Sequence, residues 1–129
     1  MATPYFRVQT IAPTFMKGQS GSLRINTFDA DGAPVDVSSG YTLQKFNLTP
    51  PTGFNPNSSI PDVSASFTAT FDATGLTLTW TAAQGTTLQG TPKQQTAFAT
   101  VLISNDSGTT KQLVAQGNVN CPYVNNALA

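Results

Sequence analysis

Apolar and polar residues alternate along much of the chain with a period of two. In LTLTWT, residues 76–81, Leu76, Leu78 and Trp80 alternate with threonine, and SFTATF at 66–71 repeats the pattern. Because successive side chains of a strand point to opposite faces, this alternation is typical of β-strands with one buried face. We expect further strands at residues 4–11, 22–28, 35–38, 41–48, 96–104 and 111–120.

Two of these strands depart from the plain alternation. In YTLQKFNL, residues 41–48, the four apolar side chains change parity after Leu43, and a β-bulge near Gln44 and Lys45 would bring all four to one face. In AFATVLI, residues 97–103, both parities are apolar. The face of this strand that is turned away from the core must therefore be covered by a loop or by a partner.

Turn sequences separate the strands, and little of the chain has a helical pattern. The turn-forming sequences are ADGAP at 30–34, ATG at 73–75 and NDSG at 105–108, the last of which predicts a hairpin. The best helical candidate is 81–88, where Gly85 should limit the helix to about one turn. The fold expected is all-β, an antiparallel β-sandwich of seven to eight strands. Its core should contain Leu23, Ile25, Leu43, Phe67, Phe71, Leu78, Trp80 and Phe98.

Three segments are not explained by these strands. We divide the chain into an N-terminal arm or edge strand at 1–20, a sandwich at 21–120 with a long Pro-rich loop insertion at 49–65, and a C-terminal tail at 121–129. Large apolar side chains in the arm, loop and tail either pack in the core of the domain or are buried in a neighbouring protein. On the second alternative, the partner-binding residues are Tyr5, Phe6, Ile11, Phe15, Phe54, Ile60 and Tyr123.

The low charge of the chain argues against several kinds of partner. Only 9% of the residues are charged, the net charge is zero, and Glu and His are absent. Nucleic-acid binding needs Lys and Arg to neutralise phosphates, and no stretch approaches the ~20 apolar residues that cross a bilayer, so we expect neither partner. The N-terminus lacks the apolar region of a secretory signal, and the single Cys121 cannot form an internal disulfide. We therefore expect synthesis in a reducing cytoplasm.

The residue types needed for most catalytic and cofactor sites are also missing. Without His, a Ser–His or Cys–His nucleophile cannot be assembled, and one Cys cannot form a zinc site. The chain has no glycine-rich phosphate-binding motif. We expect a protein that is not an enzyme and that uses no cofactor.

Asp29, Asp31 and Asp36 are half of the acidic residues and lie within eight positions of one another. The sequence DADG supplies two ligand positions and the glycine of a calcium-binding loop, but the terminal Glu is absent and strands are expected on both sides. Asp followed by Gly also stabilises tight turns. We expect a turn here, and a calcium site formed by these three aspartates is the alternative.

Three segments together resemble a known class of module. GSLRINTFDADGAPVDVSSGYTL, FDATGLTLTWTAAQGTTL and AFATVLISNDSGTTKQLVAQGNV are similar to the small immunoglobulin-like modules of tailed-bacteriophage virion proteins. Those modules occur in head-decoration proteins and in the N-terminal domain of upper-baseplate proteins. The resemblance covers about residues 20–120 and implies an Ig-like sandwich. The Pro-rich insertion at 49–65 departs from the pattern, and within these 129 residues the module is not joined to a fibre or receptor-binding region.

The resemblance implies a structural role in a virion that is assembled in a host bacterium. A free-standing module with extended ends favours a capsid decoration or cement protein, which binds and stabilises the shell of the major capsid protein and could form a homo-oligomer. The alternative is a tail or baseplate adaptor that links virion components. A third choice, a carbohydrate-binding module, would require two or three exposed rings on one face.

Overall fold

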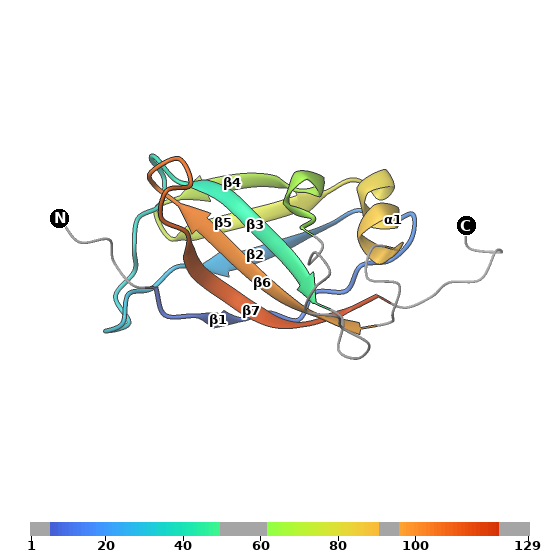
Figure 1. Cartoon of the computed structure of the whole chain (residues 1–129), viewed down its shortest axis with the longest axis horizontal. Helices are drawn as coiled ribbons and strands as arrows, with labels where there is room; N and C mark the ends of the chain where they lie inside the picture. Colours follow the sequence, from blue (N-terminus) through green and yellow to red (C-terminus); the bar gives the residue numbers. More distant parts are fainter. Residues whose placement is uncertain (1–5, 50–61, 91–95, 122–129) are drawn as a thin grey trace.

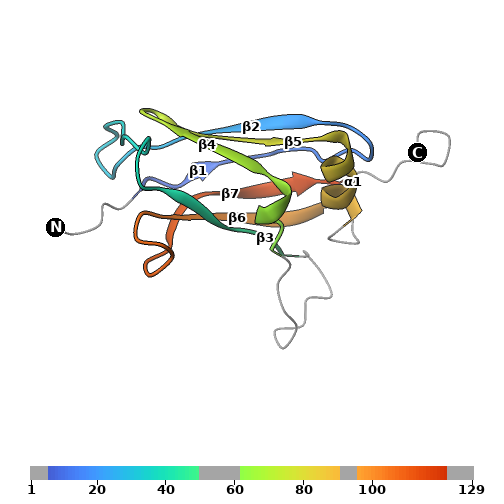
Figure 2. The same cartoon turned by 90° about the horizontal axis from the view of Figure 1, so that it is seen from above.

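The computed structural model describes residues 6–49, 62–90 and 96–121, which form two β-sheets packed face to face (Figures 1 and 2). The four-stranded sheet has the order β1-β7-β6-β3, and the three-stranded sheet has the order β2-β5-β4. Helix α1 closes one end of the sandwich (Figure 2). These features confirm the expected all-β sandwich. The strands are β1 (Gln9–Thr10), β2 (Gly21–Asn26), β3 (Thr42–Thr49), β4 (Thr68–Asp72), β5 (Gly75–Trp80), β6 (Thr96–Ser104) and β7 (Gln112–Asn120).

The hairpin predicted at 105–108 forms, and the turn predicted at 73–75 also joins two antiparallel strands. Strands β4 and β5 pair antiparallel from Thr68 with Thr79 to Asp72 with Gly75, and β6 pairs antiparallel with β7 across the loop at 105–111. In that loop Gly108 has a φ of 92°, a conformation that glycine adopts without steric cost.

The β-bulge predicted in β3 is also present. Leu43 pairs with Ile103 of β6 and Lys45 pairs with Leu102, so that Gln44 is the extra residue. The bulge restores the parity of the apolar side chains: Phe46 and Leu48 are fully buried, and Tyr41 and Leu43 pack against the core.

The strand predicted at 35–38 does not form. Val35 donates its backbone N–H to the carbonyl of Thr27 (2.9 Å), whereas Val37 donates to the carbonyl of Asp72 (3.2 Å). These two acceptors belong to different parts of the chain, so the segment makes two separate contacts and no continuous ladder. It still places the fully buried Val37 in the core.

An aromatic cluster lies at the centre of the core. Phe15 packs edge-on against Trp80 with ring centroids 5.2 Å apart, and Phe46 lies 4.6 Å from Phe67. Of the predicted core residues, Ile25, Phe67, Leu78 and Trp80 are buried, and Leu23, Leu43 and Phe71 are partly buried against them.

The prediction of Phe98 as a core residue is wrong. Its side chain is 38% exposed. The buried side chains of β6 are those that alternate with it: Ala97, Ala99, Val101 and Ile103. The reason lies in the neighbouring strand β3, where Phe46 pairs with Val101 and Leu48 pairs with Ala99. Directly opposite residues share one face of a sheet, so Val101 and Ala99 face the core together with the buried Phe46 and Leu48, and Phe98 faces outward.

The N-terminal segment forms part of the sandwich from Phe6 onward. Strand β1 pairs parallel with β7, and the pairing continues where Ile11 donates to the carbonyl of Gln116 (3.0 Å) and Phe15 to that of Asn120 (2.9 Å). Strand β1 is therefore an edge strand of the four-stranded sheet.

Helix α1 (Ala82–Gly90) is longer than the single turn that we predicted. Thr81 and Gln84 form a capping box, in which the N–H of Gln84 donates to Oγ1 of Thr81 (3.2 Å) and the N–H of Thr81 donates to Oε1 of Gln84 (2.8 Å). Gly85 lies against the backbone of residues 16–19, where a Cβ would overlap the carbonyl oxygen of Gln19. The glycine therefore permits close packing and does not end the helix. Within the described ranges, no helix has the length and apolar character to span a bilayer.

Candidate functional site

The aspartate group at 29–36 forms two local turns. Oδ1 of Asp29 accepts hydrogen bonds from the backbone N–H groups of Asp31 (2.9 Å) and Ala33 (3.0 Å), and Gly32 has a φ of 87°. Asp36 instead accepts from the backbone N–H and the hydroxyl of Ser38, and these bonds lower the pKa of its carboxyl. In the part of the chain that the structure describes, no three acidic or thiol side chains are grouped closely enough to hold a metal. The predicted turn is therefore present.

Three further aspartates, Asp62, Asp72 and Asp106, accept hydrogen bonds from backbone N–H groups in the same manner. Asp62 accepts from the N–H groups of Phe46 and Ser64 (both 3.0 Å) and forms an ion pair with Lys45 (3.5 Å). Burial raises the pKa of Asp62, but these hydrogen bonds and the lysine outweigh burial and leave its pKa below the ordinary value. Asp106 accepts from the hydroxyl of Ser104 (2.6 Å) and the N–H of Thr110 (2.8 Å), which lower its pKa.

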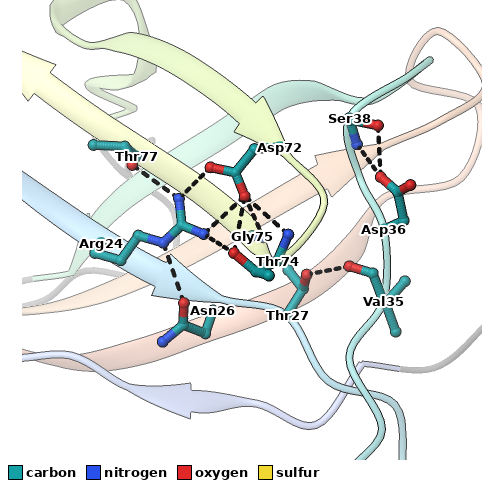
Figure 3. A network of polar contacts seen from close by, with 10 residues as sticks. All are labelled: Arg24, Asn26, Thr27, Val35, Asp36, Ser38, Asp72, Thr74, Gly75 and Thr77. Carbon is teal, nitrogen blue, oxygen red and sulfur yellow. Dashed lines mark hydrogen bonds and ion pairs between the residues drawn. The ribbon is translucent and has the colours of Figure 1, made fainter.

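Asp72 lies at the centre of a polar network on the outer face of the three-stranded sheet (Figure 3). The guanidinium of Arg24 reaches across β5 and binds both carboxylate oxygens of Asp72, at 2.6 and 2.8 Å. Asp72 also accepts from the backbone N–H groups of Thr74 (2.9 Å) and Gly75 (3.1 Å). The hydrogen bonds from Arg24 and then from Thr74 hold the pKa of Asp72 well below its usual range. The pair links β2 to the β4–β5 hairpin and neutralises both charges.

Cys121 does not have the surroundings of a reactive thiol. Its side chain is fully buried, and its sulfur lies 4.0 Å from the carbonyl oxygen of Leu88. Burial raises the pKa of the thiol to about 11. Because the thiolate is the nucleophilic form, a thiol with this pKa is unreactive at neutral pH.

The structure separates the proposed partner-binding residues into two groups. Phe6, Ile11 and Phe15 are 8%, 5% and 0% exposed and belong to the hydrophobic core. Of the two alternatives given for the apolar side chains of the arm, these three follow the first: they pack in the core of their own domain, and their assignment as partner-binding residues is wrong for this conformation. The remaining four, Tyr5, Phe54, Ile60 and Tyr123, lie outside the described residues.

The outer faces of the two sheets differ in chemistry. On the three-stranded sheet, the outward side chains are Ser22, Thr68, Thr70, Thr77 and Thr79 together with the Arg24–Asp72 pair. On the four-stranded sheet, Phe98 is exposed, and Leu102 of β6 lies directly opposite Leu113 of β7. Both of these leucines are partly exposed. Within the described ranges, the other large hydrophobic side chain that is as exposed as Phe98 is Val8 at 37%, which immediately precedes β1.

The sequence predicted that β6 would have a second apolar face, but it assigned Phe98 to the wrong side. The signal for this second face is the parity that Phe98 shares with Leu102. Comparison with known proteins finds no family model and no curated protein that matches the chain.

Proposed function

We propose that this chain is a non-enzymatic structural protein of tailed-phage virions, a capsid decoration or cement protein that binds and stabilises the shell of the major capsid protein. The observation that carries the proposal is the use of its acidic groups. Asp29, Asp36, Asp62, Asp72 and Asp106 all accept hydrogen bonds from backbone N–H groups two to four residues further along the chain. This use of the carboxylates supports a scaffold role, and a sequence with no Glu and no His offers few other groups for acid–base chemistry.

The strand order supports the Ig-like part of the proposal. In constant-type immunoglobulin domains one sheet contains strands C, F and G, and the other contains A, B, E and D. Here β3, β6 and β7 have the neighbours of C, F and G, and β2, β5 and β4 have the order B-E-D. This topology is one that the resemblance to phage virion modules implies, although sandwiches of this kind carry many functions.

A weakly charged, rigid sandwich suits adhesion to a repetitive shell. Many copies of a modest interface sum through multivalency, so no single contact has to be strong. On this proposal, Tyr5, Phe54, Ile60 and Tyr123 are the apolar residues that contact the capsid. A carbohydrate-binding module is disfavoured because Phe98 is the single aromatic side chain with high exposure among the described residues, and a sugar platform would need more than one ring.

The test adds purified protein to phage particles that lack it and measures the bound copies by sedimentation and quantitative gel analysis. A cement protein should bind in numbers that match the capsid subunits and should raise the temperature at which the shell opens. Binding of only a few copies per particle, at the tail or baseplate, would replace the cement proposal by the adaptor alternative. The double variant Tyr5→Ser, Tyr123→Ser should lower the number of bound copies.

A further inference from the structure

The N-terminal segment, residues 6–15, is inserted between the two sheets along the edge of β7. Between ring centroids, Phe15 lies 6.1 Å from Phe46 on the four-stranded sheet and 5.2 Å from Trp80 on the three-stranded sheet. Phe15 and Ile11 are 0% and 5% exposed. A sandwich without this segment would expose the centre of its core to water, so the groove that contains the segment has to be occupied.

The groove matches the segment in shape and in hydrogen bonding. Asn120 of β7 accepts from the N–H of Phe15 (2.9 Å) and donates to the carbonyl of Pro13 (3.0 Å), as a neighbouring strand does. The carbonyl oxygen of Ile11 lies against Gly117, where a side chain would exclude it. These contacts specify the occupant of the groove: an extended segment with buried side chains at alternate positions and the sequence of residues 6–15.

A short link, residues 16–20, joins the segment to β2. The N–H of Gln19 donates to the carbonyl of Met16 (3.2 Å), and Gly18 has a φ of 76°, so the link is a tight turn. The N–H of Gly18 donates to Oγ1 of Thr86 (2.8 Å), which places the turn beside α1, where β2 also begins (Figure 2). The contacts inside the groove do not involve the link. The groove therefore fits the same segment of a second copy as well as its own.

We propose that two copies of this chain exchange their N-terminal segments. Residues 6–15 of each copy would occupy the groove of the other, and the link at 16–20 would open from a turn into an extended connection. Five extended residues span at most ~17 Å, so the two sandwiches would meet at their α1 ends. Exchange of an identical element is a low-cost route to a dimer, and short strained links favour it. The proposal goes beyond the cement function and does not depend on it, because it concerns the isolated protein.

Gly18 provides a means of shifting the balance between the closed and the exchanged form. Its positive φ disfavours any residue with a Cβ, and among the described residues no atom lies within 4 Å of the position that a Cβ would take. Gly18→Ala therefore strains the turn without a steric overlap, and an extended link relieves the strain. Gly40 has a φ of 81° and equally open surroundings, but it lies in a loop that exchange leaves unchanged. Gly40→Ala is the matched control.

The first test refolds the full chain from urea at about 10 μM and at about 1 mM and measures the molar mass by light scattering. Exchange competes with closure within one chain, so the wild type should contain a dimer after refolding at the higher concentration. Gly18→Ala should raise the dimer-to-monomer ratio by roughly tenfold or more, because each dimer relieves the strain of two links. Gly40→Ala should leave the ratio within about twofold of the wild type.

The second test locates the contact with a disulfide. Thr10 of β1 lies opposite Gln116 of β7, and both side chains are exposed. Neighbouring strands lie ~4.8 Å apart, which is within the Cα separation of disulfides. A Thr10→Cys chain refolded and oxidised together with a Gln116→Cys chain should give a mixed disulfide dimer. Asn118→Cys, two residues further along the same face of β7, should replace Gln116→Cys poorly.

Two results would overturn the proposal. One is a wild-type chain that refolds only to a monomer at about 1 mM. The other is a dimer that forms mixed disulfides as readily with Asn118→Cys as with Gln116→Cys, or whose amount Gly18→Ala and Gly40→Ala change equally, because its contact would then lie outside the groove. Neither result bears on the binding of the protein to particles, which tests the cement function separately.

Discussion

The carbonyl oxygen of Ile11 lies directly against Cα of Gly117, at a position that a Cβ would occupy. The N-terminal segment can follow the edge of β7 only because residue 117 has no side chain. Gly117→Ala should therefore displace the segment that contains Ile11 and Phe15, at a cost of roughly 1–3 kcal/mol in the free energy of unfolding. Urea denaturation measures the loss. Asn118→Ala, an exposed change on the same strand, is the control and should change stability by less than about 0.5 kcal/mol.

Gln112 is a buried amide without a compensating contact. Its side chain is 9% exposed, and neither Oε1 nor Nε2 has a hydrogen-bond partner among the described residues. Since an unpaired buried amide loses its bonds to water on folding, Gln112→Met should raise the free energy of unfolding by about 1 kcal/mol. Gln19→Met, the same change at an exposed position, should leave it within about 0.5 kcal/mol of wild type. Equal effects at both positions would contradict the assignment of Gln112 as a buried amide without a hydrogen-bond partner.

Trp80 and Phe98 should respond in opposite ways to truncation. Trp80 is buried and packs against Phe15 and Phe67, so Trp80→Ala should cost roughly 3–5 kcal/mol. Phe98 is exposed on the far side of β6, so Phe98→Ala should cost about 1 kcal/mol or less when measured at low protein concentration. Chemical denaturation of both variants checks the difference, and comparable losses would place Phe98 in the core after all.

The lowered pKa of Asp72 should make the protein sensitive to acid. The pKa of this carboxyl is lower in the folded chain than the ~3.9 of an unfolded Asp, because Arg24 and Thr74 donate hydrogen bonds to its charged form. The stabilisation is thus present above about pH 4 and is lost as the pH falls through the folded pKa. Asp72→Asn should lower the Tm at pH 7 and flatten its decline below about pH 4.

The control for this pH dependence is Asp31→Asn, because the Asp31 carboxylate has no hydrogen bond or ion pair within the described residues. Its Tm should follow the wild-type curve through the acid range. If the Tm of Asp72→Asn falls with pH in parallel with the Tm of the wild type, the Arg24–Asp72 pair has no part in acid unfolding.

The turn at 29–34 should be insensitive to calcium. Asp29 already accepts two backbone N–H bonds, so no metal is needed to hold the loop. The Tm in excess EDTA should equal that in excess calcium. A fall of several degrees in EDTA that calcium restores would instead favour a site at Asp29, Asp31 and Asp36.

Local patterns predicted the antiparallel part of the fold, because alternation and turn chemistry act between neighbours in sequence. The β3 bulge could be read from the parity change after Leu43, and the hairpin at 72–75 from its turn residues. The parallel pairing of β1 with β7 could not be read in this way, since it joins residues more than 100 positions apart. The core position of Phe15 depends on that pairing and was missed with it.

Two other errors have particular causes. The sidedness of β6 follows from its pairing with β3, which the sequence of β6 alone does not show: Val101 and Ala99 lie opposite the buried Phe46 and Leu48 and share their face. The length of α1 was underestimated because Gly85 was treated only as a weak helix former. The capping box of Thr81 and Gln84 was visible in the sequence and would have indicated a longer helix.

The central claim is that this chain acts as an adhesive part of a virion and performs no chemistry. The most direct test is to label the chain with a C-terminal epitope in its natural source and to locate the epitope on virus particles purified from that source by gold-labelled antibody and electron microscopy. We predict label distributed over the surface of the capsid. Particles that carry no label, with the protein recovered only from the lysate, would contradict the claim.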